Sequence, residues 1–341
     1  MHKASTTPDD KRSLPVQIAA AHYAAHVAEI HYNLHAAGTG KGPKVEKQVT
    51  KPLSEFHNKI KRNLIEFNTR ANKAARHLDI ACGRGGDIDK WAQAGLDFVF
   101  GVDVSPNEIK YARMRYEKYL EKGSRVKLQA YFDATRDIGT RTIEWPIEWP
   151  YISGAFDSVS CMFAAHYFFV SEYSVDCFLH NVSNALKPGG VFYGTLPLGP
   201  RVIEFLNGKK SHSNKVLTIQ DKWSTEPSEE PPALGAKYTF DLQESVTGAA
   251  KEESQSMEYL VTPEIFIKIA ARHFLYPMEP KDQNNYFTTT EPAQAQFVKE
   301  NYEATSTGGV FRYFNPKYEG PAAKDLEEVS RLNASFVFVR R

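Results

Sequence analysis

The sequence predicts an α/β protein whose centre is a doubly wound parallel sheet. Between residues 76 and 196, short apolar segments alternate with helical ones, as βαβ units require. A glycine-rich turn joins the first apolar segment to the first helical one, and an acidic residue, Asp103, closes the second apolar segment. This combination is typical of a Rossmann-like sheet that binds a nucleotide cofactor at the ends of its strands.

The first strand, turn and helix follow from residue types. Residues 77–81 are short and apolar enough for a buried parallel strand, and residues 88–94 have helical spacing. The turn between them contains Gly83, Gly85 and Gly86. Glycine takes positive φ and lets a ligand approach the backbone, and a helix start leaves amide groups free. The turn therefore predicts a site for a carboxylate or a phosphate.

Two acidic residues give this predicted site its chemistry. Asp103 follows the strand 98–102, about 20 residues after the first glycine, where a ribose-binding carboxylate lies in a βαβ unit. This spacing fits both NAD and S-adenosylmethionine. Asp87 at the helix start would repel a pyrophosphate, but it would attract the ammonium and sulfonium charges of S-adenosylmethionine. The alternative is that Asp87 only caps the helix.

The rest of the sheet is predicted from the same alternation. A helix at 107–120 follows the second strand. A helix at 175–186 ends at residues 187–190, Lys-Pro-Gly-Gly, which stop the helix and are followed by a central strand. The remaining strands are predicted at 126–132, 156–162, 191–196 and 334–339.

The chain ahead of the sheet predicts a tail and two helices. Residues 1–17 are polar and predict a disordered tail. A helix at 17–34 and an amphipathic helix at 53–64 follow, with a flexible basic linker at 38–52 between them. We expect a single domain over residues 18–341.

The later part of the chain divides into an insertion and a closing segment. The cofactor-binding half is predicted at about 53–196. Residues 206–257 are polar and predict an exposed insertion that carries one strand, 237–242, and no second core. Residues 258–341 complete the domain, with a helix at 262–274, and residues 279–325 are predicted to be mostly loop.

Composition limits the classes of function. The chain has 42 Lys and Arg against 41 Asp and Glu, a net charge of +1, so only a local patch can attract a polyanion. Cys82, Cys161 and Cys177 form neither a disulfide framework nor a zinc spacing, which predicts an intracellular protein without a metal site. No apolar segment reaches membrane-spanning length, and residues 1–14 lack the apolar core of a signal peptide, so a soluble protein is expected.

Further motifs carry a resemblance to a known family. They are VAEIHYN at 27–33, LSEFHNKIK at 53–61, DIACGRGGD at 79–87, FAAHYF at 163–168, GTLP at 194–197 and MEYLV at 257–261. Over most of residues 27–270 the chain resembles the eukaryotic and viral mRNA cap guanine-N7 methyltransferases. The resemblance implies a class I S-adenosylmethionine-dependent methyltransferase sheet. It also implies methyl transfer to N7 of the guanine cap of GpppN-ended RNA.

The resemblance implies S-adenosylmethionine as the cofactor. Lys61 would meet its carboxylate, and Asp87 its amino group. Asp103 would accept from both ribose hydroxyls, and Asp133 from the adenine amino group. The residues assigned to the cofactor are Lys61, Ala81, Gly83, Asp87, Asp103, Asp133, Cys161 and Met162.

On the acceptor side the resemblance implies a guanine pocket and a triphosphate contact. Glu258 would accept hydrogen bonds from guanine N1–H and the exocyclic amine, and thus read a base edge. Because N7 already has a lone pair, no residue is assigned as an acid or base, and His166, Tyr167 and Glu258 would act by positioning. The residues assigned to the cap are Arg84, Arg115, Phe163, His166, Tyr167, Pro197 and Glu258.

Several of these assignments have structural alternatives. His166 and Tyr167 could belong to an aromatic core cluster, Glu258 could be a solvated acid at a strand end, and Arg115 could belong to a basic helix face. The chain also departs from the family pattern, with Met162, Ala81, Arg84 and Ala334 where members usually have Gln, Gly, Lys and a Tyr over the cap. Either an aromatic residue of the segment 279–320 replaces that Tyr, with Tyr286, Phe287 and Tyr313 as candidates, or the substrate is a different guanosine compound.

Three functions fit the sequence. The first is cap guanine-N7 methylation, the second is methylation of another guanosine-containing or small-molecule substrate, and the third is cap binding without catalysis. Intact Asp87 and Asp103 argue against the third, because a protein without catalysis has no need to hold both ends of the cofactor. We expect capped RNA as the partner, other capping enzymes as candidate partners, no membrane, and a monomer. The location would be the nucleus in a eukaryote and the cytoplasm for a virus.

Overall fold

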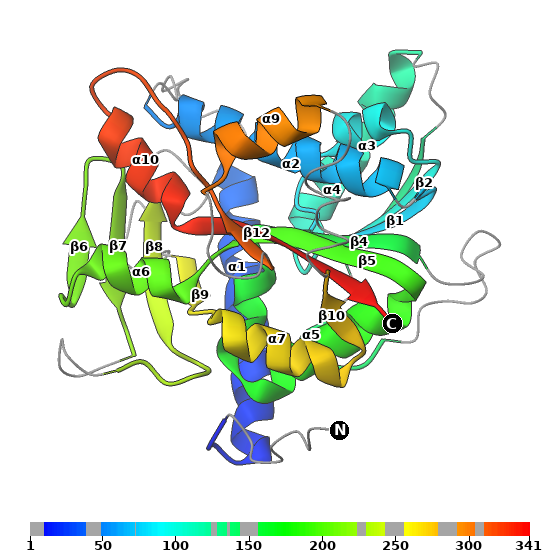
Figure 1. Ribbon diagram of the computed structural model, residues 1–341. Coiled ribbons are helices and arrows are strands. Elements are labelled where there is room, and N and C mark those ends of the chain that lie inside the picture. The colour runs from blue at the N-terminus through cyan, green and yellow to red at the C-terminus, as the bar shows by residue number, and fades with distance from the viewer. Residues whose placement is uncertain are drawn as a thin grey trace.

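The molecule is a doubly wound α/β protein, as the sequence predicts. The computed structural model describes residues 10–38, 49–71, 73–123, 128–134, 137–143, 156–223, 230–242, 256–278, 292–303 and 310–341. The central sheet has the strand order β10-β12-β5-β4-β1-β2-β3, with β11 paired to β12 (Figure 1). Its strands are β1 (Arg76–Ile80), β2 (Phe98–Val102), β3 (Gln129–Asp133), β4 (Phe156–Met162), β5 (Leu186–Pro197), β10 (Leu275–Pro277), β11 (Phe311–Tyr313) and β12 (Asn333–Arg340).

The first five strands run parallel, and β12 runs antiparallel between β5 and β10. In β2, Phe98, Phe100 and Val102 join the buried cluster on one face of the sheet, whereas Val99 joins the cluster on the other. This alternation, apolar on both faces, is expected of a central strand covered by helices on both sides. The carboxyl ends of β1, β2 and β4 therefore meet at one edge, where ligands of such sheets bind.

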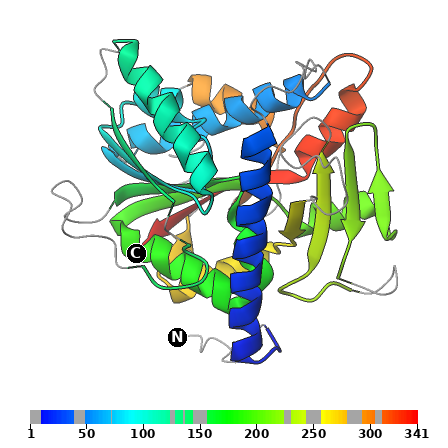
Figure 2. The same cartoon turned by 180° about the vertical axis from the view of Figure 1, so that it is seen from behind.

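Helices cover both faces of the sheet. In Figure 1, α2, α3 and α9 lie on one side, and α5 and α7 on the other. The helix α1 contacts both α4 and α5, and Figure 2 shows it in dark blue across the edge of the sheet. The helices around the sheet are α1 (Leu14–Gly38), α2 (Lys51–Ala71), α3 (Ile88–Ala94), α4 (Pro106–Glu121), the 3-10 helix η1 (Ala165–Val170), α5 (Glu172–Ala185), α7 (Pro263–Arg272) and α9 (Pro292–Asn301).

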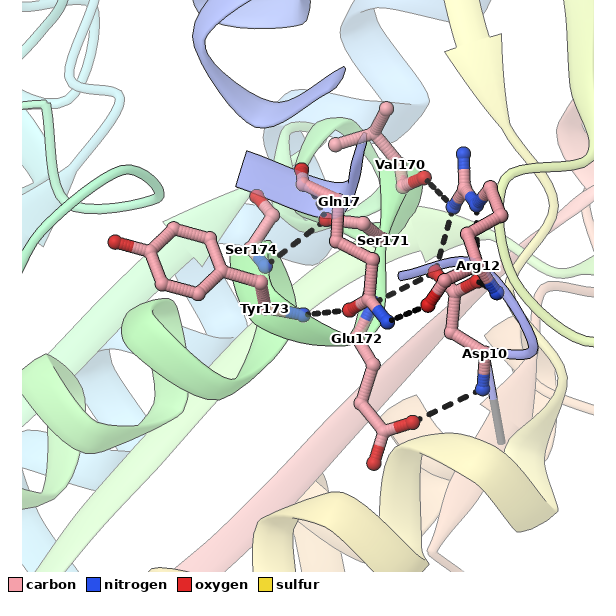
Figure 3. A network of polar contacts seen from close by, with 8 residues as sticks. All are labelled: Asp10, Arg12, Gln17, Val170, Ser171, Glu172, Tyr173 and Ser174. Atoms are coloured by element: carbon pink, nitrogen blue, oxygen red, sulfur yellow. Dashed lines mark hydrogen bonds and ion pairs between the residues drawn. The ribbon is translucent and has the colours of Figure 1, made fainter. Parts of the chain in front are cut away.

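The predicted disordered tail is wrong for residues 10–17, and residues 1–9 lie outside the described part. The amide of Asp10 donates to Glu172 Oε2 at 2.9 Å, and Arg12 Nη2 donates to the carbonyl of Val170 at 2.6 Å (Figure 3). Gln17 adds a further contact between the same two segments, because its Oε1 accepts a hydrogen bond from the amide of Tyr173 at 3.0 Å. Polar side chains that look like a tail in the sequence here hold the start of α1 against the start of α5.

The insertion carries a core layer, so the prediction of no second core is wrong. It forms a second sheet in the order β6-β7-β8-β9. Val216, Leu217, Ile219 and Tyr238 are buried in a cluster with residues of α6 and α10. Of the insertion, residues 224–229 and 243–255 lie outside the described part. The elements of this layer are α6 (Gly199–Leu206), β6 (Ser211–Ser213), β7 (Leu217–Asp221), β8 (Lys237–Leu242), β9 (Ser256–Tyr259) and α10 (Ala323–Arg331).

The prediction of mostly loop for residues 279–325 is also wrong where the structure describes them. The helix α9, the strand β11 and the start of α10 fall in this segment. β11 has three residues, too few to show a period in sequence, and its pairing with β12 defines it. Residues 279–291 and 304–309, and residues 39–48 of the predicted basic linker, lie outside the described part. No helix of the described ranges is long and apolar enough to span a membrane.

Candidate active site

The glycine turn and Asp103 hold each other in place at the ends of β1 and β2. The amide of Gly83 donates to Asp103 Oδ2 at 2.9 Å, and the amide of Ser105 donates to Asp103 Oδ1 at 2.9 Å. Gly85 has φ of +65°, and a Cβ there would lie 2.9 Å from Ile88 Cδ1. A residue with a Cβ would be strained at this φ and would press against Ile88 and Ala112, so the turn favours glycine.

The carboxylate of Asp103 faces a cavity and is hard to ionise. Burial raises the pKa of Asp103 to about 6, against the amide hydrogen bonds from Ser105 and Gly83. Each carboxylate oxygen receives one hydrogen bond and keeps a further lone pair for a ligand. A diol at this position would meet two acceptors, provided that the carboxyl group is ionised.

The cavity beside Asp103 is shaped by strand ends and by small residues of α1. It has a volume of about 930 Å³, counting its open mouth. Ala81 and Met162 line it at the ends of β1 and β4, and the alanines of α1 form the opposite wall. Alanine side chains leave the space that larger residues would fill. The residues of α1 in this wall are Ala21, Ala24, Ala25, Ala28 and Tyr32.

Asp87 anchors a buried ion cluster beside the turn. Lys61 Nζ of α2 lies 2.9 Å from Asp87, and Lys90 Nζ lies 2.6 Å from it. Burial would raise the pKa of Asp87, but the charges of Lys61 and Lys90 outweigh it and hold this pKa below its usual value. Asp87 is the N-cap residue of α3 but makes no side-chain capping hydrogen bond to it, and its carboxylate contacts the two lysines instead. The cluster carries one net positive charge, which suits a carboxylate ligand.

A chain of buried polar side chains lies beneath the turn. Ser160 of β4 bonds Asp79 of β1, and the His77 ring lies 2.8 Å from Ser160 Oγ. Burial raises the pKa of Asp79 to about 8, with the charge of Asp87 adding to the effect. Burial also lowers the pKa of His77 to about 3. At neutral pH, Asp79 is therefore mainly protonated and His77 is neutral, so the interior of the sheet carries little charge here.

The acceptor side centres on a buried His and Glu from distant parts of the chain. His166 of η1 is 2% exposed, and Glu258 of β9 is 4% exposed. Glu258 Oε2 accepts from the hydroxyl of Tyr238 at 2.9 Å and lies 3.5 Å from His166 Nε2. Neither ring nitrogen of His166 has a hydrogen-bond partner among the described residues. Buried polar atoms without partners are costly, and a polar ligand would satisfy those of His166.

Tyr167 connects this pair to the cavity. Its hydroxyl lies 2.9 Å from that of Tyr32 in α1 and 2.8 Å from Ser256 Oγ in β9. Its ring lines the cavity and stands 4.4 Å, centre to centre, from the ring of His166. The same side chain thus touches the cofactor side and the acceptor side.

Two further aromatic side chains of this region were missed by sequence reasoning. The ring of His57 in α2 stacks on Phe163 at 4.8 Å between centres, and Phe314 meets Phe163 edge-on at 6.4 Å. Phe163 has φ of +56° and donates its amide to the carbonyl of Thr195 at 2.8 Å. His57 lies one helical turn before Lys61, and that spacing was the available signal. Phe314 had no such signal.

The structure does not bring all predicted residues to the cavity. Cys161 is fully buried in the core and is not part of the cavity wall, and neither is Asp133, whereas Asp137 lies in that wall. Lys61 and Asp87 lie beside this wall rather than in it. His166 and Glu258 are also absent from this wall, and the ring of His166 packs against Tyr167, which belongs to it.

On the cap side, Arg84 and Ala334 have contacts that the sequence did not indicate. Arg84 Nε lies 2.9 Å from Glu108 Oε1, and its guanidinium lies over the ring of Tyr111. Ala334 is fully buried and pairs with Tyr313 across β11 and β12. Pro197 is buried at the end of β5, and Arg115 is exposed on α4. The other two candidates for the missing Tyr, Tyr286 and Phe287, lie outside the described residues.

These features define the class of protein. Parallel strands in the order β3-β2-β1-β4-β5, an antiparallel β12 beside β5, and a glycine turn facing an acid at the end of β2 make a Rossmann-like class I methyltransferase fold. No group of three or more His, Cys, Asp or Glu residues in the described ranges is placed to hold a metal ion.

Residues 17–309 match the model of the mRNA (guanine-N(7))-methyltransferase domain, and the chain belongs to this family. It is 32% identical over 233 residues to the mRNA cap guanine-N(7) methyltransferase of Drosophila melanogaster, covering 64% of this chain and 53% of that protein. The Caenorhabditis briggsae enzyme of the same name is 37% identical over 231 residues, covering 65% of this chain and 59% of that protein. The chain thus spans little more than half the length of these relatives.

The solved structures similar to this chain resemble it less closely. Magnesium protoporphyrin IX methyltransferase from Synechocystis, solved with bound SAH, is 13% identical with a TM-score of 0.47, over 93% of this chain and 99% of that chain. A similarity of this size carries no argument about the substrate.

Proposed function

We propose that the protein transfers a methyl group from S-adenosylmethionine to N7 of the guanine cap of GpppN-ended RNA. The observation that carries this proposal is the buried His166–Glu258 pair. Both ring nitrogens of His166 lack a hydrogen-bond partner among the described residues, and its ring packs against Tyr167, which lines the cofactor cavity. Guanine presents donors at N1 and the exocyclic amine, and an acceptor at O6. The carboxylate of Glu258 can accept from the two donors, and an N–H of His166 can donate to O6.

The residues around the cavity fit S-adenosylmethionine. Asp103 offers an acceptor on each oxygen to the ribose hydroxyls, and Lys61 offers its ammonium group to the carboxylate. Asp87 already contacts two lysines, so the amino group would share this carboxylate with them. Asp137, in the cavity wall beyond β3, is a second candidate beside Asp133 for the adenine amino group. When bound, the cofactor supplies an electrophilic methyl group on a sulfonium centre.

The protein's own contribution is to hold the acceptor. Guanine N7 carries a free lone pair, so no residue needs to remove a proton before methyl transfer. Correct placement of the two reactants can contribute about 7 to 11 kcal/mol to lowering the barrier. Methylation makes the base cationic, and the carboxylate of Glu258 at its Watson–Crick edge would favour this developing charge. A ring stacked on the base would add about 1 to 3 kcal/mol to binding.

Incubation of the protein with GpppG, capped RNA and methyl-labelled cofactor tests this function. We expect the label in 7-methylguanosine after nuclease digestion. Label at another position would refute the proposal. Methylation of a small molecule that neither GTP nor GpppG inhibits would favour the second candidate function, and cap affinity without turnover would favour a binding protein.

Location and partners extend the proposal. The two relatives named above are animal proteins, which favours the eukaryotic alternative and hence action in the nucleus. Imaging of the tagged protein tests this, and an exclusively cytoplasmic signal would contradict it. Capped RNA is the proposed partner, while association with other capping enzymes and a monomeric state stay predictions.

A further inference from the structure

One face of α4 carries a row of basic side chains that the proposed reaction does not use in full. Tyr111, Arg115, Lys118 and Lys122 follow one another at spacings of four, three and four residues, so they lie along one face of the helix, with Lys122 as the residue that caps its C-terminal end. The three basic side chains are exposed, and none of them forms an ion pair within the described ranges. Figure 2 shows α4 in teal on the outside of the molecule beside α1. We call Arg115, Lys118 and Lys122 the α4 stripe.

The stripe begins at the glycine turn. Arg115 Nη1 lies 3.5 Å from the position of a Cβ on Gly86. Arg84, the other predicted triphosphate contact, has its guanidinium 5.0 Å from the centre of the Tyr111 ring. Lys118 and Lys122 follow Arg115 along the helix, farther from the glycine turn.

Acidic neighbours do not neutralise the stripe. Glu108 lies near the start of the same face, but it pairs with Arg84 at 2.9 Å. Glu117 and Glu121 fall about 130° and about 90° around the helix from the centre of the stripe, and neither forms an ion pair with it within the described ranges. Because the whole chain has a net charge of only +1, an uncompensated row of this kind is the local patch that a polyanion requires.

We propose that the α4 stripe binds the backbone of the RNA body beyond the cap triphosphate. This inference rests on the proposed function, because it places the RNA on the path that leaves the cap site. From Arg115 to Lys122 the helix rises about 10 Å. A stacked nucleic acid strand places about three phosphates over that length. The contacts are with phosphates, so they bind any RNA sequence.

Binding of a short capped RNA of about 20 nucleotides, followed by fluorescence anisotropy at several salt concentrations, tests the stripe. The variant is Lys118→Gln with Lys122→Gln, and the matched control is Lys110→Gln with Lys209→Gln. Both control lysines are exposed, and Lys110 lies on another face of α4. We expect the dissociation constant to rise about tenfold in the stripe variant at low salt. The slope of log affinity against log salt should become less steep by about 1.4, because two contacts with a single strand are lost.

The control should retain wild-type affinity and slope. Unchanged RNA affinity in the stripe variant, or an equal loss in the control, would overturn the inference and leave the stripe to another partner. Methylation of GpppG is measured in parallel and should be the same in all three proteins, since GpppG lacks the RNA body that the stripe is proposed to bind. A wild-type protein that binds the RNA through the stripe but does not methylate GpppG would refute the proposed function and not the stripe.

Discussion

The cofactor side and the acceptor side of the site are built in opposite ways. On the cofactor side, Gly83, Asp87 and Asp103 lie within about 20 residues of one another, and each is hydrogen-bonded or ion-paired to a fixed neighbour. On the acceptor side, His166 and Glu258 come from distant segments, and the ring nitrogens of His166 have no partner among the described residues. The polar contacts of the first half are in place without a ligand, whereas the second half keeps hydrogen-bonding groups that a ligand would satisfy.

This difference indicates where binding energy is available. A side chain whose hydrogen bonds are already satisfied exchanges partners at small net gain, about 0.5–1.5 kcal/mol for an ordinary hydrogen bond. A buried group without a partner gains more when a matching ligand arrives, and it also rejects ligands that lack the matching group. We therefore expect substrate specificity to depend on the acceptor side.

The largest effects should come from exchanging one carboxylate on each side. Glu258→Gln should lower kcat/KM for GpppG at least about 100-fold and leave cofactor affinity unchanged, because the base edge loses its charged acceptor. Asp103→Asn should instead weaken cofactor binding about 100-fold, since the ribose hydroxyls lose a charged acceptor. Calorimetry for the cofactor and initial rates for GpppG separate the two.

Tyr238→Phe is the matched control for Glu258, because it removes the hydroxyl that donates to this carboxylate and keeps the ring. Its effect on GpppG should be smaller than that of Glu258→Gln. If Glu258→Gln weakened the cofactor as much as the cap, the two sides would not be separate.

The next effect is the dependence of cofactor binding on pH. The pKa of Asp103 is raised to about 6 by burial, and the ribose needs the ionised form. Affinity should be constant well above pH 6 and fall up to about tenfold per pH unit below it. Titration by calorimetry between pH 5 and pH 8 measures this. Asp103→Asn should show no such dependence, and a wild-type affinity that did not change over this range would contradict the assignment.

A smaller effect is expected at His57, on the acceptor side. His57→Ala removes the ring stacked on Phe163 and should raise KM for GpppG about fivefold, since an aromatic pair contributes about 0.5–1.5 kcal/mol. Cofactor affinity and kcat should change little. His57→Phe keeps the stack and should restore the wild-type KM, although it loses the contact of His57 Nε2 with Ser330 Oγ at 3.2 Å. An equal loss in both variants would show that this contact, and not the stack, positions Phe163.

The smallest effect should appear in the free energy of unfolding, through Asp79 in the sheet below the glycine turn. Burial raises the pKa of Asp79 to about 8, so between about pH 6.5 and pH 8 this carboxyl holds a proton in the folded protein that the unfolded chain has released. Below about pH 6.5 the lowered pKa values of His57 and His77 act in the opposite direction. Between about pH 6.5 and pH 8 the free energy of unfolding should therefore fall as the pH rises. Asp79→Asn should remove this fall, as measured by urea unfolding. An unchanged slope would mean that Asp79 is ionised in the folded state.

Prediction from sequence was accurate where a signal is local. The strands β1, β2 and β4, the glycine turn and Asp103 lie within one or two residues of their predicted positions, since apolar runs and glycine spacing reflect contacts close along the chain. The wrong predictions concern segments whose structure depends on partners far away in the sequence. The three-residue strand β11 is defined by its pairing with β12. The sheet of the insertion packs against α6, which precedes it in the sequence, and α10, which follows it.

By itself, the sequence determined the doubly wound sheet, the turn that holds Asp103, and the family to which the chain belongs. Only the tertiary structure decided that Lys61 and Lys90 share Asp87, that Arg84 pairs with Glu108, and that His57 and Phe314 enclose Phe163. Residue type and spacing specify a local conformation and the chemistry a side chain can offer. Which partner that side chain meets depends on packing between segments far apart in sequence, and such contacts have no period to detect.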